Sequence, residues 1–114
     1  MSIKLNRVYE KAEAADGYRV LIDRLWPRGL KKEAAAIDVW LKDIAPSPEL
    51  RSWFGHDPKK FHEFSKLYSA ELKNNPAVAE LRALAKQHKT LTLLYGARDA
   101  KHNHALVLQA YLKN

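Results

Sequence analysis

The sequence of 114 residues contains no cysteine and only four glycines. The absence of cysteine excludes disulfides, thiolate zinc sites, iron–sulfur clusters and a cysteine nucleophile. No apolar run approaches the roughly 20 residues that cross a bilayer, so we expect no membrane partner. The first residues, Met-Ser-Ile-Lys-Leu-Asn, lack the apolar segment of a secretion signal, which predicts a cytoplasmic protein.

What the chain does contain is typical of a globular protein. Hydrophobic residues make up 46% and charged residues 29% of the sequence. The length leaves room for one domain over residues 1–114, built around one core. The formal net charge is +7, which makes nucleic acid a possible partner. The excess lies mostly in lysines along predicted helices, where a solvated helix face is the alternative explanation.

Hydrophobic patterning predicts the secondary structure. Alternation and β-rich composition predict strands at residues 3–9, 18–23 and 90–95, and favour a strand over a helix at residues 37–41. Three pairs of a capping residue and a proline predict helix starts at Ser47-Pro48, Asp57-Pro58 and Asn75-Pro76. The corresponding helices cover about 48–54, 58–73 and 76–88, one helical turn is expected at 31–36, and a last helix starts near His102.

Strands that alternate with helices predict an α/β fold. We expect a single compact domain with a small, mostly parallel sheet flanked by helices, in a two-layer or three-layer sandwich. Ligands of such sheets bind beyond the carboxyl ends of the strands. Two loops are expected there, at residues 23–29 and at residues 95–99, and the second leads into Asn103 and His104.

The junction at Gly96-Ala97-Arg98-Asp99 is the first candidate for chemistry. Free amide groups and the helix dipole favour an anion there, and Arg98 adds positive charge. The alternative is that Asp99 or Asn103 caps the helix while Arg98 pairs with Asp99. One glycine is too few for a P-loop or a dinucleotide-binding fingerprint.

The loop after the second strand is the next candidate, because Arg24 and Arg28 flank Trp26. Guanidinium groups bind phosphate or carboxylate through paired hydrogen bonds, and an indole can stack on a base. The alternative is structural: Trp26 fills the core and Asp23 pairs with Arg24.

Acid–base chemistry is possible if Asp23, Asp99 and His104 converge. The alternative for His104 is a buried residue on the apolar stripe of the last helix. His102 and His104 do not share a helix face, so no metal is expected, and no cofactor signature is present. The chain also lacks the Gly-x-Ser-x-Gly turn of a serine hydrolase.

Several segments together resemble the domain-of-unknown-function 488 family, in its YeaO-like bacterial branch. They are residues 17–30 (GYRVLIDRLWPRGL), 40–47 (WLKDIAPS), 50–57 (LRSWFGHD) and 92–99 (TLLYGARD), with Asn103-His104-Ala105. The resemblance spans nearly the whole chain and implies a compact cytoplasmic α/β domain. It brings no established activity with it.

The resemblance also implies a set of polar motif positions: Arg19, Asp23, Arg24, Arg28, His56, Asp57, Arg98, Asp99, Asn103 and His104. Other branches of the family carry cysteines near the end of the last strand and at the start of the following helix. This chain has Tyr95 and Asn103-His104-Ala105 there, so thiol chemistry does not transfer to it.

The leading hypothesis is therefore a site for a small anion, such as a phosphate or carboxylate of a nucleotide or sugar phosphate. Its proposed ligand-binding residues are Arg19, Arg24, Trp26, Arg28, Arg98 and Asn103. Asp23, Asp99 and His104 would orient the ligand or move protons, which would allow hydrolysis or group transfer. The alternatives are a nucleic-acid-binding module and an interaction protein that forms a homodimer through an apolar face.

Overall fold

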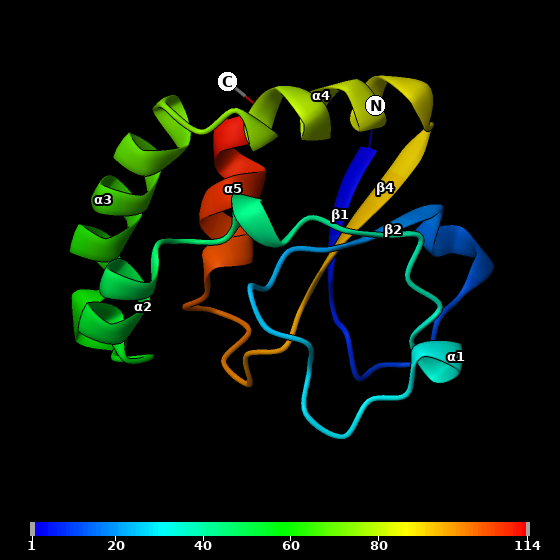
Figure 1. The fold of residues 1–114 in the computed structure, drawn as a ribbon, viewed down its shortest axis with the longest axis horizontal. Coiled ribbons are helices and arrows are strands. Elements are labelled where there is room, and N and C mark those ends of the chain that lie inside the picture. Colours follow the sequence, from blue (N-terminus) through cyan, green and yellow to red (C-terminus); the bar gives the residue numbers. More distant parts are fainter. Residues whose placement is uncertain (1, 114) are drawn as a thin grey trace.

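Within residues 2–113, four parallel strands form a single sheet. The computed structural model describes residues 2–113, and Figure 1 shows its fold. The strands are β1 (Ser2–Arg7), β2 (Tyr18–Leu21), β3 (Val39–Trp40) and β4 (Thr90–Tyr95), and their order in the sheet is β1-β4-β2-β3. All three neighbouring pairs are parallel. The predicted α/β class is confirmed, and the segment with two possible assignments contains the short strand β3.

The helices follow the predicted capping signals. They are α1 (Lys32–Ala35), α2 (Pro48–Phe54), α3 (Phe61–Lys73), α4 (Ala77–Gln87) and α5 (His104–Lys113). Ser47 Oγ accepts a hydrogen bond from the amide of Leu50, and the carboxylate of Asp57 accepts one from Lys59. The segment predicted as one helix over 58–73 begins as a 3-10 turn at Pro58–Lys60 and continues as α3.

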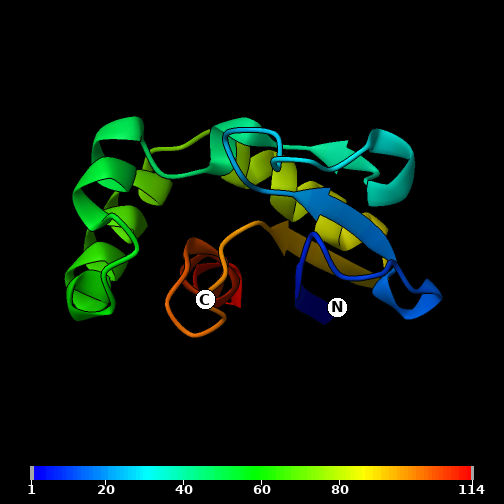
Figure 2. The same ribbon diagram turned by 90° about the horizontal axis from the view of Figure 1, so that it is seen from below.

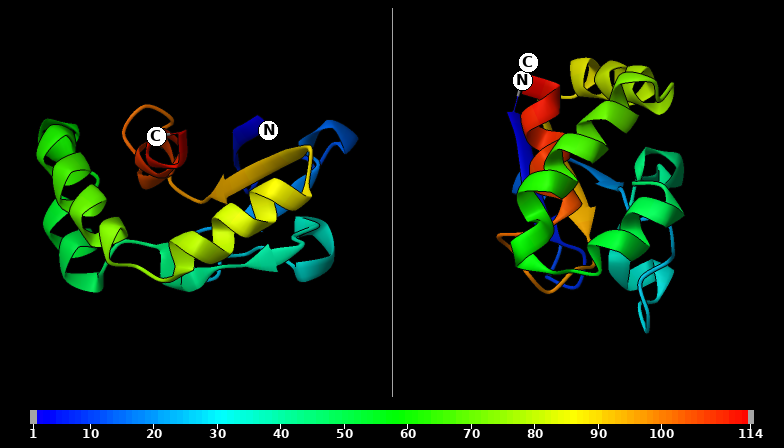
Figure 3. Two further views of the ribbon diagram at one scale, coloured as in Figure 1. Left: turned by 90° about the horizontal axis from the view of Figure 1, so that it is seen from above. Right: turned by 90° about the vertical axis from the view of Figure 1, so that its left-hand side faces the viewer.

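The main core lies between one face of the sheet and helices α2 to α5. Alternate residues of β4, such as Leu91 and Leu93, point into this core together with Val20 of β2. Helix α5 packs against β1, β4 and α3, as the two views in Figure 3 show. Strand β4 is buried on both faces, as its nearly unbroken apolar run predicts.

The opposite face of the sheet is covered by the connection between β2 and β3, light blue to cyan in Figure 2. Leu21 and Leu94 form a second, smaller core there with Val8. Trp26 of the connection and Trp40 of β3 pack against it. The longer helices therefore lie on one face of the sheet, as in the expected two-layer arrangement. The irregular connection between β2 and β3 covers the other face.

Candidate functional site

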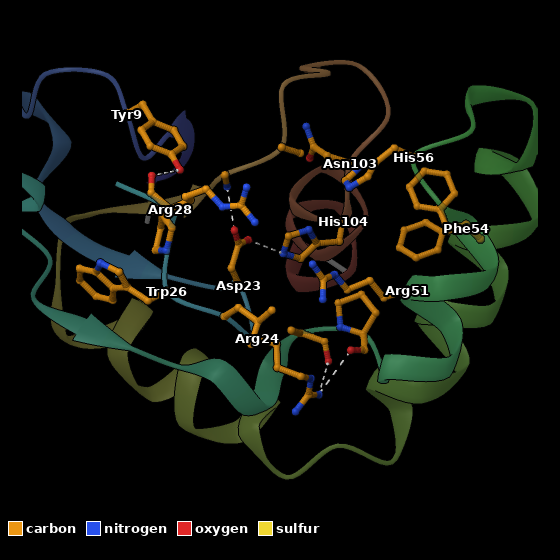
Figure 4. Close-up of a pocket in the computed structure, with 17 residues that line it drawn as sticks. Tyr9, Asp23, Arg24, Trp26, Arg28, Arg51, Phe54, His56, Asn103 and His104 are labelled. Carbon is orange, nitrogen blue, oxygen red and sulfur yellow. Dashed lines mark hydrogen bonds and ion pairs between the residues drawn. The ribbon is translucent and has the colours of Figure 1, made fainter. Parts of the chain in front are cut away.

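A cavity of about 330 Å³ lies beyond the carboxyl ends of β1, β2 and β4. Figure 4 shows the 17 residues that line it. They include Tyr9 after β1, residues 23–28 after β2, and Gly96, Ala97 and Asn103 after β4. The structure thus brings together the two loops that the sequence places at this edge of the sheet. The segment 45–56 and Phe64 of α3 close the remaining side.

Three aromatic side chains hold the irregular loop at residues 23–30 in place. Trp40 Nε1 donates to the carbonyl oxygen of Asp23 at 2.6 Å, and Trp26 Nε1 donates to that of Leu30 at 2.7 Å. The hydroxyl of Tyr9 donates to the carbonyl oxygen of Arg28 at 2.9 Å. These donors bind the backbone of the loop, so its side chains remain available for the cavity.

Asp23 and His104 form a contact in the middle of the cavity (Figure 4). His104 Nε2 lies 3.2 Å from Asp23 Oδ1 and 3.1 Å from the carbonyl oxygen of Ile22. Both neighbours are acceptors, which favours the tautomer of His104 with its hydrogen on Nε2. Asp23 Oδ2 accepts the amide hydrogen of Gly96 at 2.9 Å, and a Cβ at Gly96 would lie 2.9 Å from that same oxygen.

Arg24 connects the floor of the cavity to the segment before α2. Its Nη2 donates to the carbonyl oxygens of Ala45 and Pro46, both at 3.3 Å. Its Nε is buried and has no hydrogen-bond partner among residues 2–113. The structural alternative, in which Asp23 pairs with Arg24, is wrong because Asp23 instead binds Gly96 and His104.

Arg28 and Arg51 reach toward the centre of the cavity from opposite sides (Figure 4). Both residues are exposed, and neither guanidinium group makes an ion pair within the described chain. Arg51 is absent from the sequence-based site. It lies three residues before Phe54 on α2, a spacing that places the two side chains on one helix face. That spacing was the available signal for Arg51.

The end of α2 brings a further lining residue that the sequence-based site omitted. Gly55 and His56 both have a left-handed backbone, with φ of 52° and 58°. A left-handed conformation is uncommon for a residue with a side chain, and His56, which has it, lines the cavity. The sequence favours a loop and a cap at His56-Asp57; the cap at Asp57 is confirmed.

Trp26 combines the two roles that the sequence left open. Its ring meets the Trp40 ring edge-on at 5.5 Å, and it packs against the second core. It is half-buried and also lines the cavity. Trp26 is therefore a wall that the core holds in position.

The residues after Gly96 mainly organise the start of α5. Asp99 accepts hydrogen bonds from the amides of Lys101 and His102 and pairs with His102 Nδ1 at 2.9 Å. The hydrogen bond from Lys101 is the largest cause that lowers the pKa of Asp99, followed by the one from the His102 side chain. Asp99 does not line the cavity.

Asn103 and Arg98 differ in position. The buried Asn103 accepts from the amide of Leu106 at 3.1 Å and donates to the carbonyl oxygen of Asp99, so it caps α5 and also lines the cavity. Arg98 is exposed outside the cavity, and no ion pair with Asp99 forms in the described chain.

Arg19 lies at the opposite end of β2 from the cavity. Its side chain is buried and forms an ion pair with Asp16. It also donates to the carbonyl oxygens of Ala35 and Ala36, at 3.0 and 2.9 Å. These contacts occupy the guanidinium group, so the structure places Arg19 in the scaffold and not among the ligand-facing residues.

We also searched residues 2–113 for metal-binding clusters and for membrane-spanning helices. This part of the chain contains no group of three or more His, Cys, Asp or Glu side chains that could hold a metal ion. None of its helices is long and apolar enough to cross a membrane.

Known proteins of similar sequence place this chain in a family. A family model described as "Inactive DUF488-N3 subclade" matches residues 2–114. The chain is 45% identical to the uncharacterized protein YeaO of Escherichia coli (strain K12) over 114 residues, which cover all of this chain and 99% of that protein. It is 42% identical over 110 residues to the uncharacterized proteins Rv3073c of Mycobacterium tuberculosis and Mb3100c of Mycobacterium bovis, covering 96% of this chain and 92% of each relative. No solved structure matches it.

Proposed function

Because this chain belongs to the inactive DUF488-N3 subclade, we propose that it binds a small anionic molecule in its cavity without transforming it. One observation carries the proposal. The guanidinium groups of Arg28 and Arg51 reach into one cavity from opposite sides, and neither has an ion-pair partner in residues 2–113. Guanidinium groups in such positions bind carboxylate and phosphate through charge-assisted hydrogen bonds.

The charge balance of the cavity supports an anion. Its lining contains Arg24, Arg28 and Arg51 but one carboxylate, Asp23. That carboxylate already accepts the Gly96 amide hydrogen and contacts His104. Its single negative charge offsets one of the three arginines, and a ligand can supply the negative charge that is still missing.

The lining also favours binding over hydrolysis or group transfer. The side chains that line the cavity in the described chain include no Ser, Thr, Cys or Lys. The serine, threonine, cysteine and lysine nucleophiles of covalent catalysis are thus missing from the described lining, and the Tyr9 hydroxyl that is present donates to the carbonyl oxygen of Arg28. Asp23 and His104 remain suited to orient a ligand through hydrogen bonds.

A thermal-shift experiment tests the proposal with inorganic phosphate, glycerol phosphate and benzoate. A ligand at 100 times its Kd stabilises a protein by about 2.7 kcal/mol, which corresponds to a shift on the order of 10 °C for a domain of this size. We expect a shift with at least one of these anions, and its loss in Arg28→Gln and Arg51→Gln.

Arg98→Gln is the matched control, because it removes the same charge from an exposed residue outside the cavity. It should keep the shift. The proposal fails if no anion shifts the unfolding temperature, or if the shift survives in the double variant of Arg28 and Arg51. Salt-dependent DNA binding that survives in the double variant would favour the nucleic-acid alternative instead.

A further inference from the structure

We propose that the ligand is a phosphate monoester attached to a single aromatic ring. This inference rests on the proposed function, since it names the chemical class that the same cavity takes. Four properties of the cavity point to this class: its charge, the directions of its free arginines, its aromatic walls and its size.

The charge of the cavity matches a dianion. Three arginines and one aspartate give the lining an excess of two positive charges, counted over its arginine and carboxylate side chains. A phosphate monoester carries about −1.5 to −2 at pH 7, whereas a carboxylate or a phosphate diester carries one charge. The dianion therefore balances the excess, and the singly charged groups leave part of it uncompensated.

The directions of the free arginines favour a tetrahedral group. Arg28 and Arg51 approach the centre of the cavity from opposite sides (Figure 4). A phosphate monoester has three terminal oxygens that accept hydrogen bonds in different directions, so it can bind both guanidinium groups at once. A carboxylate has two oxygens in one plane and suits a single guanidinium fork better.

Aromatic side chains form walls on two sides of the cavity. Phe54 stacks on Phe64, with ring centroids 4.2 Å apart and an angle of 15° between the planes. His56 lies beside Phe54 on that wall, at 6.2 Å between ring centroids, and Trp26 lies on the other side (Figure 4). Phe54 and Phe64 are buried and stack on each other, so the exposed His56 ring and the half-buried Trp26 indole are the flat surfaces that can contact a planar ring, which a sugar or glycerol phosphate lacks.

The size of the cavity limits the ligand to one ring. About 330 Å³ lies at the small end of the range of roughly 300–1,000 Å³ for small-molecule pockets. This volume admits a phosphate and one ring system. It is too small for a dinucleotide or a stretch of nucleic acid strand, so the cavity itself does not serve the nucleic-acid alternative.

Titration calorimetry at pH 7.5 with matched probes tests each part of the inference. Phenyl phosphate is the reference probe. Methyl phenyl phosphate keeps the ring but has one charge, and glycerol phosphate keeps the dianion but has no ring. We expect phenyl phosphate to bind about tenfold more tightly than either, since each comparison removes one class of contact. AMP, added as a fourth probe, distinguishes a nucleoside monophosphate from a simple aryl phosphate.

The outcomes separate this inference from the proposed function. If glycerol phosphate binds as tightly as phenyl phosphate, the inference that the ligand has an aromatic ring is wrong. If methyl phenyl phosphate binds as tightly as phenyl phosphate, the inference that the ligand is a dianion is wrong. In both cases the anion site would stand if Arg51→Gln still lowers affinity about tenfold and Arg98→Gln does not. Absence of binding by every probe would overturn the proposed function as well.

Discussion

Strand β2 has arginines near both of its ends, and the two ends use them differently. At the amino end, Arg19 is buried against Asp16 and two backbone carbonyls. Beyond the carboxyl end, Arg28 is exposed and makes no ion pair within residues 2–113. The partners of an arginine therefore decide its role. A guanidinium group whose donors are used by the protein is scaffold, and one whose donors are free is available to a ligand.

The neighbours of each arginine explain the difference. At the amino end, polar side chains converge on Asp16: Asn6 Nδ2 donates to its carboxylate at 3.2 Å, and Thr92 Oγ1 donates to its carbonyl oxygen at 2.7 Å. At the carboxyl end, the donors of Tyr9 and Trp40 go to backbone carbonyls. One end therefore has a buried side-chain network, and the other has a fixed backbone that carries free side chains.

The largest expected effect comes from breaking the ion pair at the amino end. Arg19→Met leaves the carboxylate of Asp16 buried without its cation, and removal of one partner of a buried pair typically costs about 3–5 kcal/mol. Arg28→Met, the matched control, should change the free energy of unfolding by less than about 0.5 kcal/mol because the residue is exposed. Urea unfolding measures both variants. Equal losses would contradict the distinction between scaffold and ligand-facing arginines.

The next effect depends on pH. The pKa of Asp16 lies below its ordinary value of 3.8, mainly because the amide of Glu13 donates to it and also because Arg19 binds it. A lowered pKa in the folded state means that the carboxylate stabilises the fold fully above the pKa of the unfolded chain, about 3.9. This contribution is lost as the pH falls through the lower pKa of the folded state.

Asp16→Asn tests this dependence. At pH 7 the variant should lose about 2 kcal/mol of stability, the usual value for hydrogen bonds to a charged group. The difference from the wild type should shrink as the pH falls below about 4, where Asp16 is protonated in the unfolded chain but still ionised in the folded protein. Urea midpoints between pH 7 and pH 3 provide the measurement. A difference that stays constant down to pH 3 would refute the role given to the ionised carboxylate.

The elements were predictable from local chemistry. Capping by Ser47 and Asp57 before prolines sets helix starts, and it depends on residues adjacent in the chain. The nearly unbroken apolar run of β4 agrees with its position between β1 and β2, because a strand that is covered on both faces needs apolar residues on both. The covering of the second face by an irregular segment was not predicted, because Trp26 and Trp40 contact it through tertiary packing that no periodicity records.

The site was predictable only in outline. Asp23 and His104 meet because both follow strands whose carboxyl ends share one edge of the sheet. Arg51 was missed because it reaches the cavity from α2, which is not attached to a strand end. Arg19 was grouped with ligand-facing residues because the sequence does not show that Asp16 and two carbonyls occupy its donors.

A smaller effect should come from loosening the backbone at the carboxyl end. Trp40→Phe removes the donor to the carbonyl oxygen of Asp23, which should cost about 1 kcal/mol of stability. Trp40 does not line the cavity, so its loss should lower the affinity for phenyl phosphate only through the position of the loop. Trp53→Phe is the control, since Trp53 is exposed on α2 outside the lining. If Trp40→Phe leaves the affinity at the wild-type value, the position of the loop does not depend on this hydrogen bond.

The smallest effect on stability is expected at Tyr9, where stability and ligand affinity should respond differently. Tyr9→Phe removes the hydrogen bond to the carbonyl oxygen of Arg28, but the residue is 40% exposed and water can replace the donor. The free energy of unfolding should therefore change by about 0.5 kcal/mol or less, while calorimetry should show weaker binding of phenyl phosphate, since the backbone that carries Arg28 is no longer fixed. Tyr111→Phe on α5, outside the cavity lining, should leave binding unchanged. A loss of stability at Tyr9 as large as that of Asp16→Asn would mean that both ends of β2 are scaffold. A loss of affinity for phenyl phosphate without a comparable loss of stability would indicate that the carboxyl end of β2 serves ligand binding.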